Sequence, residues 1–305
     1  MSRSKHDRLF LISFLPTAFI ISSILVLFLI IFSSNSLDSI KMFGVKLFTE
    51  SIWDPEKEVY GVLAPIIGTF TTSSIAVFIS LFFSLPLSIL ITEFLRDRAR
   101  DIFSSVVELM GGIPTIVYAV WSLNYLAPFL RAYVMEPLHM YLGFIPIFSC
   151  RPVTGFSIFT AGIAIGISIV PYMTSIIVES YRLIPSIYRE ACLGIGATRY
   201  ETTKILLSLA KPAILASAIL GFARATGETT IAVVTIGNSM NLSPCLFAPG
   251  YTVSALIASN YENAGLYTYA ESVLHASALV ILFVTLILSF VGLMILDRWR
   301  VKIVV

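Results

Sequence analysis

An arginine and a glutamate, Arg224 and Glu228, lie near the middle of a long apolar segment of this 305-residue chain. Because they are four residues apart, they share one face of a helix and can form an ion pair. A charged side chain at the centre of a membrane costs about 2.5–3.5 kcal/mol on insertion scales. Pairing, hydration or a bound ligand must therefore offset both charges.

Two interpretations of this pair remain open. In the first, the two side chains neutralise each other and only lock helices together. In the second, they line a substrate path, which Gly227 favours because a local opening of the helix there would free backbone groups. Arginine suits an oxyanion, since its planar donors match phosphate in bidentate fashion. The glutamate would hold the arginine while the path is empty and then compete with the arriving anion, which permits release.

Other chemistry-bearing residues are few. Glu108, an acid, is a third candidate residue of the path, although it also fits a place at the membrane interface. His6, His139 and His275 are isolated from one another, so no metal site is predicted. No catalytic set and no G-x-x-x-x-G-K-[ST] motif occurs, so ATP would have to bind to another polypeptide and no cofactor is expected.

The elements that position these residues are predicted to be transmembrane helices. Hydrophobic residues make up 57% of the chain and charged residues only 12%, against about 25% charged in soluble domains. A water-soluble fold is therefore excluded, and an all-α polytopic membrane protein is expected. Six windows are long enough to cross about 30 Å of hydrocarbon; they are residues 9–32, 63–91, 103–130, 156–178, 213–236 and 270–296.

Charge in the connections predicts the orientation. Fourteen of the twenty Lys and Arg residues fall on one side of these windows and five on the other. The positive-inside rule then places both termini in the cytoplasm of a cell-membrane protein, as six spans require. The first window is longer than the apolar region of a secretory signal, which has about 7–15 residues, and no cleavage site follows it. We expect a retained helix.

The chain divides into an anchor helix with an external loop (1–62), a five-helix core (63–296) and a basic cytoplasmic tail (297–305). Pro86, Pro114 and Pro171 lie within windows, where proline kinks or breaks a helix. Each is either a packing feature or part of a polar pathway. Regions 131–155 and 238–268 are expected to be irregular external loops. For Cys150, Cys192 and Cys245, three unrelated thiols are favoured over a Cys150–Cys245 disulfide.

The connection between the fourth and fifth windows, about residues 181–211, is long and cytoplasmic. Polar and apolar residues alternate there at helical spacing, and Gly196 ends the first turns. The pattern predicts a short surface helix, a turn and a second helix, suited to docking in a groove of a partner protein.

This connection resembles the coupling loop of ABC importer permeases, which seats in the ATPase subunit. Glu190 and Ala191 followed by Gly196 match the E-A-A-x-x-x-G pattern, although Cys192 replaces the third small residue and Leu209 stands where proline is usual. The resemblance implies that the coupling residues are Glu190, Ala191, Gly196, Ala197, Thr198 and Arg199.

Further motifs narrow the family. Residues 224–229, R-A-T-G-E-T, are similar to the R-A-x-G-E-T segment of phosphate-specific permeases, and residues 108–118 resemble their E-L-x-x-I-P-S-V-V-Y segment with Thr115 in place of serine. Together with residues 53–55, 60–61 and 232–238, they favour the PstC type over the PstA type. The resemblance covers about residues 50–296.

A type I importer fold with a five-helix core is what this resemblance implies. The expected path residues are Arg224, Glu228, Glu108 and Thr229. The implied partners are two copies of an ABC ATPase, a second permease (a related chain or a second copy), an external phosphate-binding protein, phosphate and membrane lipid, with no nucleic acid. A sulfate or molybdate permease, an ion-gradient-driven transporter and a membrane-embedded enzyme are the less favoured alternatives.

Overall fold

The computed structural model describes residues 5–304, and most of them are helical. The only strands in this range, β1 (Trp53–Asp54) and β2 (Val59–Tyr60), form a two-stranded antiparallel hairpin. The α-helices are α1 (Lys5–Phe43), α2 (Lys46–Thr49), α3 (Leu63–Ile89), α4 (Asp97–Gly111), α5 (Thr115–Trp121), α6 (Ala127–Leu130), α7 (Glu136–Leu142), α8 (Ile158–Arg182), α9 (Ser186–Gly194), α10 (Arg199–Thr226), α11 (Thr230–Thr235), α12 (Val253–Ala264) and α13 (Ala270–Val304). Three π-helical segments, η1 (Leu90–Phe94), η2 (Ser122–Leu126) and η3 (Arg131–Met135), and one 3-10 turn, η4 (Pro146–Phe148), complete them.

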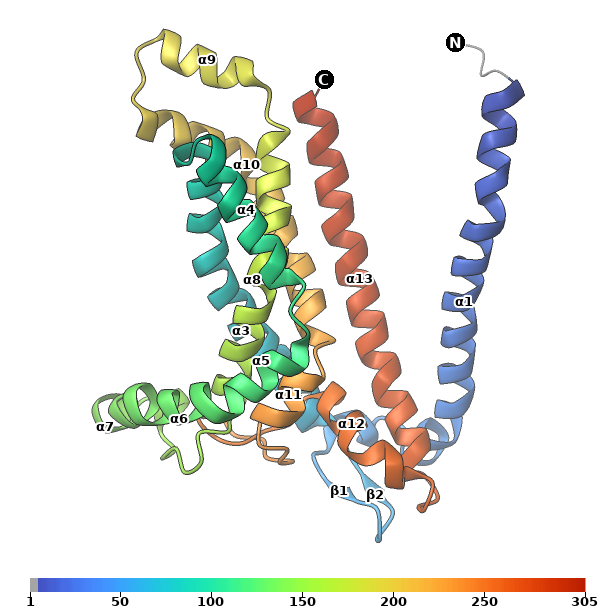
Figure 1. Ribbon diagram of the computed structural model, residues 1–305. Coiled ribbons are helices and arrows are strands. Elements are labelled where there is room, and N and C mark those ends of the chain that lie inside the picture. Colours follow the sequence, from blue (N-terminus) through green and yellow to red (C-terminus); the bar gives the residue numbers. More distant parts are fainter. Residues whose placement is uncertain (1–4, 305) are drawn as a thin grey trace.

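Five helices of the described chain are long and apolar enough to cross a membrane. They are α1, α3 with η1, α8, α10 and α13. A sixth crossing is obtained when the bent pair formed by α4 and the segment from Thr115 to Leu142 is counted as one span. Both chain ends and α9 lie at the same end of the molecule (Figure 1), as an even number of crossings requires. The predicted six-helix membrane architecture is therefore present, with one span broken.

The third predicted window, residues 103–130, is not a straight helix. Its two halves meet at an angle of 85°, because α4 ends at Gly111 and Pro114 precedes the first residue of α5 with an extended backbone. Proline cannot donate the backbone hydrogen bond that would continue α4. The segment after the bend runs sideways, away from the bundle (Figure 1).

Helices α3, α8 and α10 form the centre of the bundle, and small residues let them approach closely. A Cβ atom on Gly162 of α8 would lie 2.6 Å from Ile75 of α3, and one on Gly221 of α10 would lie 2.7 Å from the sulfur of Met173. Gly68 of α3 meets the backbone oxygen of Tyr251, with no room for a side chain between them. Small residues at such contacts are typical of helix packing in membranes.

Replacing Gly68 with alanine is expected to destabilise the fold. The added methyl group would overlap the Tyr251 carbonyl oxygen, which belongs to the backbone and cannot rotate away. Overpacking of this kind costs about 1–3 kcal/mol. Thermal unfolding of the purified chain should show a lower midpoint for Gly68→Ala. Gly265→Ala is the matched control, since nothing lies within 4 Å of its added Cβ; an equal effect of both would contradict the packing argument.

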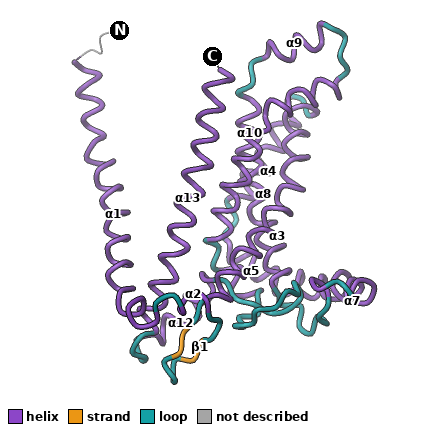
Figure 2. The backbone as a smooth tube through the Cα atoms, turned by 180° about the vertical axis from the view of Figure 1, so that it is seen from behind, coloured by secondary structure: helices purple, strands orange, loops and turns teal. Residues whose placement is uncertain are grey.

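Helix α1 stands apart from the bundle and meets α13 only at its end remote from the N-terminus (Figures 1 and 2). There the backbone nitrogen of Ser39 donates to the hydroxyl of Ser272 at 3.0 Å, and the Ser39 hydroxyl donates to the Ser272 carbonyl at 3.1 Å. None of the residues in the most apolar window of α1 is buried within the chain. This helix therefore offers an apolar surface to lipid or to another subunit.

The regions expected to be irregular external loops contain helices. Region 131–155 begins with η3 and α7, and region 238–268 holds α12. Cys150 and Cys245 form a disulfide between these two regions, with their Cα atoms 6.0 Å apart. The preference for three unrelated thiols was therefore wrong, because spacing in sequence carries no information on the distance between two loops. Cys192 is a free, buried thiol.

Several helices extend beyond their apolar windows. Helix α1 continues to Phe43, α10 begins at Arg199 and α13 continues to Val304. Hydropathy marks only the part of a helix that crosses the hydrocarbon, so polar turns at either end escape it. The connection predicted to be cytoplasmic is therefore shorter than residues 181–211, and its second half is the start of α10.

Candidate functional site

The helix that carries Arg224 ends before it reaches Glu228. Helix α10 stops at Thr226, Gly227 follows as its C-cap, and a new short helix, α11, starts at Thr230. The prediction that Arg224 and Glu228 share one helical face and pair at i, i+4 was therefore wrong. Among the described residues, no ion pair joins them, although their charges still attract each other. The local opening at Gly227, expected in the path interpretation, is present.

Arg224 lies on the exposed surface of the isolated chain. Its guanidinium carbon stands 5.3 Å from the ring centroid of Tyr172 on α8. A guanidinium over an aromatic face at this distance makes a cation–π contact, which fixes its position without neutralising its charge. The arginine is thus held in place while its hydrogen-bond donors stay available.

Glu228 and Thr229 form the connection between the two helices. A carboxylate oxygen of Glu228 accepts from the backbone nitrogen of Ile231 at 3.4 Å, near the start of α11. The Glu228 carbonyl accepts from the Ser254 hydroxyl of α12 at 2.9 Å. The Thr229 hydroxyl donates to the Gly227 carbonyl at 3.3 Å. Backbone groups freed by the break are therefore partly satisfied by nearby hydroxyls, as irregular backbone at membrane depth requires.

Glu108 is exposed on α4, away from these contacts. It borders a cleft of about 220 Å³ between α4 and α8, together with Glu179 and Arg182. Gly111, at the end of the same helix, packs against Pro171, 3.6 Å from the position of an added Cβ. No hydrogen bond or ion pair among the described residues joins Glu108 to Arg224 or Glu228. The part of the chain from Lys5 to Val304 also contains no group of three His, Cys, Asp or Glu side chains placed to hold a metal.

The predicted coupling loop has the expected form of helix, turn and helix. Helix α9 ends at Gly194, and Gly196 adopts a φ of +84°, a left-handed conformation that glycine takes at no steric cost. Thr198 and Glu201 then form a capping box that starts α10. Five of the six predicted coupling residues are exposed and Ala197 is half-buried. This end of the molecule also exposes apolar side chains of α9 and the turn, among them Ile187 and Ile195.

Two contacts that the sequence did not reveal anchor this loop to the end of α3. Arg189 of α9 forms an ion pair with Glu93 of η1, whose side chain is only 4% exposed. Arg199, a predicted coupling residue, places its guanidinium carbon 5.2 Å from the ring centroid of Phe94. Arg189 and Glu93 are 96 residues apart in the chain. The only sign of their contact in the sequence is an acidic residue, Glu93, just after an apolar window.

Removing Arg189 is expected to loosen α9. Arg189→Ala leaves the Glu93 carboxylate buried without its partner, and breaking a buried pair is more costly than replacing both members. We expect a lower unfolding temperature for Arg189→Ala and recovery of most of the loss in the double variant with Glu93→Gln. Arg182→Ala, which removes an exposed pair with Glu179, is the control and should change little. Additive losses in the double variant would show that the pair does not couple the two elements.

Comparisons with known proteins place the chain in a family. Residues 84–301 match the family described as "Binding-protein-dependent transport system inner membrane component". The chain belongs to this family. One curated relative is a "Probable phosphate transport system permease protein PstC" of Methanocaldococcus jannaschii, which is 41% identical over 94% of this chain and 92% of the relative. Another is PstC of Mesorhizobium japonicum, which is 35% identical over 87% of this chain and 83% of the relative. The resemblance to PstC-type permeases is thereby confirmed.

Solved structures agree on the fold of this inner membrane component. An inward-facing structure of the MetNI methionine ABC transporter aligns with 78% of this chain and 95% of its own, with a TM-score of 0.56 and 15% sequence identity. A second crystal form of that transporter aligns with 81% and 99%, with a TM-score of 0.56. The predicted type I ABC importer fold is therefore confirmed.

Proposed function

We propose that this chain is the permease subunit of an ATP-driven importer of inorganic phosphate. Its similarity to PstC proteins over nearly the whole chain supports the substrate. One structural observation carries the path assignment: Arg224 lies exposed beside a helix break, with no carboxylate ion pair among the described residues. A cation kept accessible at this depth would be costly unless water or an anion reaches it.

In this proposal Arg224 receives the phosphate. Its fork of donors forms two charge-assisted hydrogen bonds to the anion, while the Tyr172 ring keeps the guanidinium in place. Glu228 attracts the free arginine and repels the bound anion, so it favours release. Thr229 adds a hydroxyl near the break, and Glu108 borders the path from α4.

The loop from Glu190 to Arg199 is proposed to seat in the ATPase subunit, which hydrolyses ATP in place of this chain. Its exposed apolar side chains suit a groove in a partner. The proposed assembly contains two copies of the ATPase, a second permease and an external phosphate-binding protein. The second permease is either a related chain or a second copy of this one. Both termini would be cytoplasmic, with residues 1–62 as an anchor region, 63–296 as the core and 297–305 as a basic end.

Substrate choice is tested by competition in cells that lack their own phosphate importer and express the complete system containing this chain. We expect radiolabelled phosphate to accumulate, and unlabelled sulfate or molybdate to compete poorly. Accumulation of sulfate in preference to phosphate would replace the proposed substrate by another oxyanion.

A further inference from the structure

A pocket of about 420 Å³ lies at the α9 end of the bundle, and neither Arg224 nor any residue of the helix break that follows it lines this pocket. Helices α4, α8, α9 and α10 and the segment η1 all contribute residues to it. Three arginines line it, Arg100, Arg182 and Arg189, and none of its lining residues is Asp or Glu. This composition is unusual for an empty space between helices and indicates a place for an anion.

The three arginines differ in how their charge is balanced. Arg189 pairs with Glu93 and Arg182 pairs with Glu179, both of which lie outside the pocket lining. Arg100 has no ion pair among the described residues. It donates from one terminal nitrogen to the Leu95 carbonyl at 3.1 Å, while its buried Nε has no acceptor in the part of the chain that the structure describes. Because no carboxylate of the described residues pairs with it, Arg100 carries the charge in this pocket that an added anion would balance.

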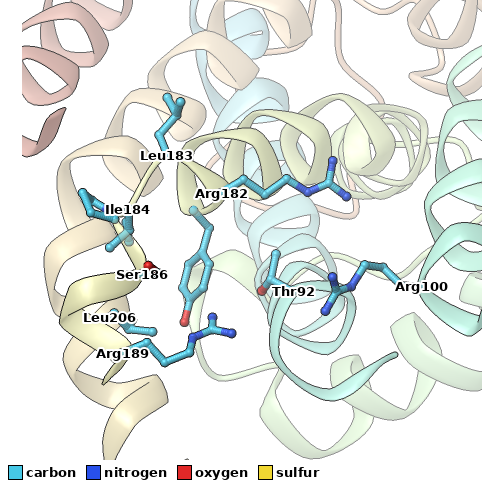
Figure 3. Close-up of a pocket in the computed structure, with 10 residues that line it drawn as sticks. Thr92, Arg100, Arg182, Leu183, Ile184, Ser186, Arg189 and Leu206 are labelled. Atoms are coloured by element: carbon cyan, nitrogen blue, oxygen red, sulfur yellow. The ribbon is translucent and has the colours of Figure 1, made fainter. Parts of the chain in front are cut away.

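The side chains are arranged to meet such an anion. Figure 3 shows Arg100 and Arg189 extending toward Thr92 from opposite sides, whereas Arg182 extends away along the edge. Thr92 already donates its hydroxyl proton to the Ser88 carbonyl at 2.8 Å. Two guanidinium groups facing each other across a pocket bind a tetrahedral oxyanion well, because each can present a pair of donors.

We propose that this pocket binds a phosphate-type anion, either free inorganic phosphate or the phosphate of an acidic lipid headgroup. The anion would join Arg100 of α4 to Arg189 of α9. Because Arg189 also holds α9 to Glu93, occupancy would tie the coupling helix to two elements instead of one and restrict its movement. The site is separate from the path at Arg224 and adds a regulatory function to transport.

The test uses the full chain in lipid nanodiscs, carrying Arg224→Gln so that the path contributes no binding. Radiolabelled inorganic phosphate is titrated in phosphatidylcholine discs. Retention of phosphatidylglycerol is measured in mixed discs by native mass spectrometry. If free phosphate is the ligand, we expect saturable binding that Arg100→Gln weakens about tenfold, as the loss of one charge-assisted contact implies. If the headgroup is the ligand, phosphatidylglycerol retention falls by a similar factor and phosphate does not bind.

Arg100→Gln is preferred to a change at Arg189 because it leaves no carboxylate unpaired. Arg98→Gln is the control, since Arg98 is exposed on the same helix and outside the pocket lining. The proposal is overturned if neither ligand responds to Arg100→Gln, or if Arg98→Gln has the same effect. If the pocket binds its anion but the complete transport system takes up no phosphate, the proposed function is refuted and the anion site stands. Failure of the proposed function and failure of the anion site are therefore distinguishable.

Discussion

Arg224→Gln is expected to abolish phosphate uptake while the chain still inserts and assembles with its partners. Hydrogen bonds to charged groups contribute about 1.5–3 kcal/mol each, and glutamine cannot supply the two charge-assisted bonds of the guanidinium. The loss corresponds to about a 100-fold or greater fall in uptake. The measurement is initial-rate uptake of radiolabelled phosphate, with co-purification of the ATPase as the check on assembly.

Two further variants separate charge from structure at this position. Arg224→Lys keeps the charge but loses the planar fork, so partial uptake is expected. Arg151→Gln removes an exposed arginine whose ion-pair partner among the described residues is Glu136, and uptake should be unchanged. Normal uptake by Arg224→Gln would mean that Arg224 serves only as a helix-packing residue.

Gly196→Pro is expected to uncouple ATP hydrolysis from transport. Gly196 has a φ of +84° and its backbone nitrogen donates to the Leu193 carbonyl at 3.0 Å. Proline fixes φ near −65° and has no N–H, at a cost of about 3 kcal/mol or more. The native turn between α9 and α10 would then fall about 100-fold in population. Phosphate transported per ATP hydrolysed should drop accordingly in reconstituted vesicles.

Substitutions at two positions show whether the turn itself matters. Gly196→Ala meets no atom within 4 Å but keeps an unfavourable backbone conformation, so a smaller loss is expected. Gly194→Ala, also free of neighbours and without a positive φ, should couple normally. An ATPase that still co-purifies with Gly196→Pro and couples normally would show that this turn is not the docking element.

Much of this architecture could be predicted from the sequence because the bilayer demands long apolar segments. The windows at α3, α8 and α13 begin at or within two residues of the observed helices. A hydropathy window does not show where the backbone changes direction, however, so residues 213–236 were predicted to form one helix. The break at Gly227 was suspected from the glycine alone, yet the pairing of Arg224 with Glu228 depended on a continuous helix and was wrong.

Sequence patterns did not reveal the contacts between segments that are distant in the chain. The Cys150–Cys245 disulfide and the Arg189–Glu93 ion pair each join residues about 95 positions apart. The turn of the predicted coupling loop was different, because its glycine, N-cap and capping glutamate all fall within a few residues of one another. The local helix pattern could therefore indicate Gly196, and the family resemblance added Thr198. Glu93 and Arg100 stood out only from the contacts between the packed helices.

The most direct measurement is uptake of radiolabelled phosphate into vesicles that contain this chain, its partner permease, the ATPase and the binding protein. Ionophores remove every ion gradient, and ATP is supplied on the ATPase side. The expected result is uptake that requires hydrolysable ATP, persists without gradients and disappears in Arg224→Gln. Uptake that continues without ATP and stops when the gradients collapse would contradict it and identify a gradient-driven transporter instead.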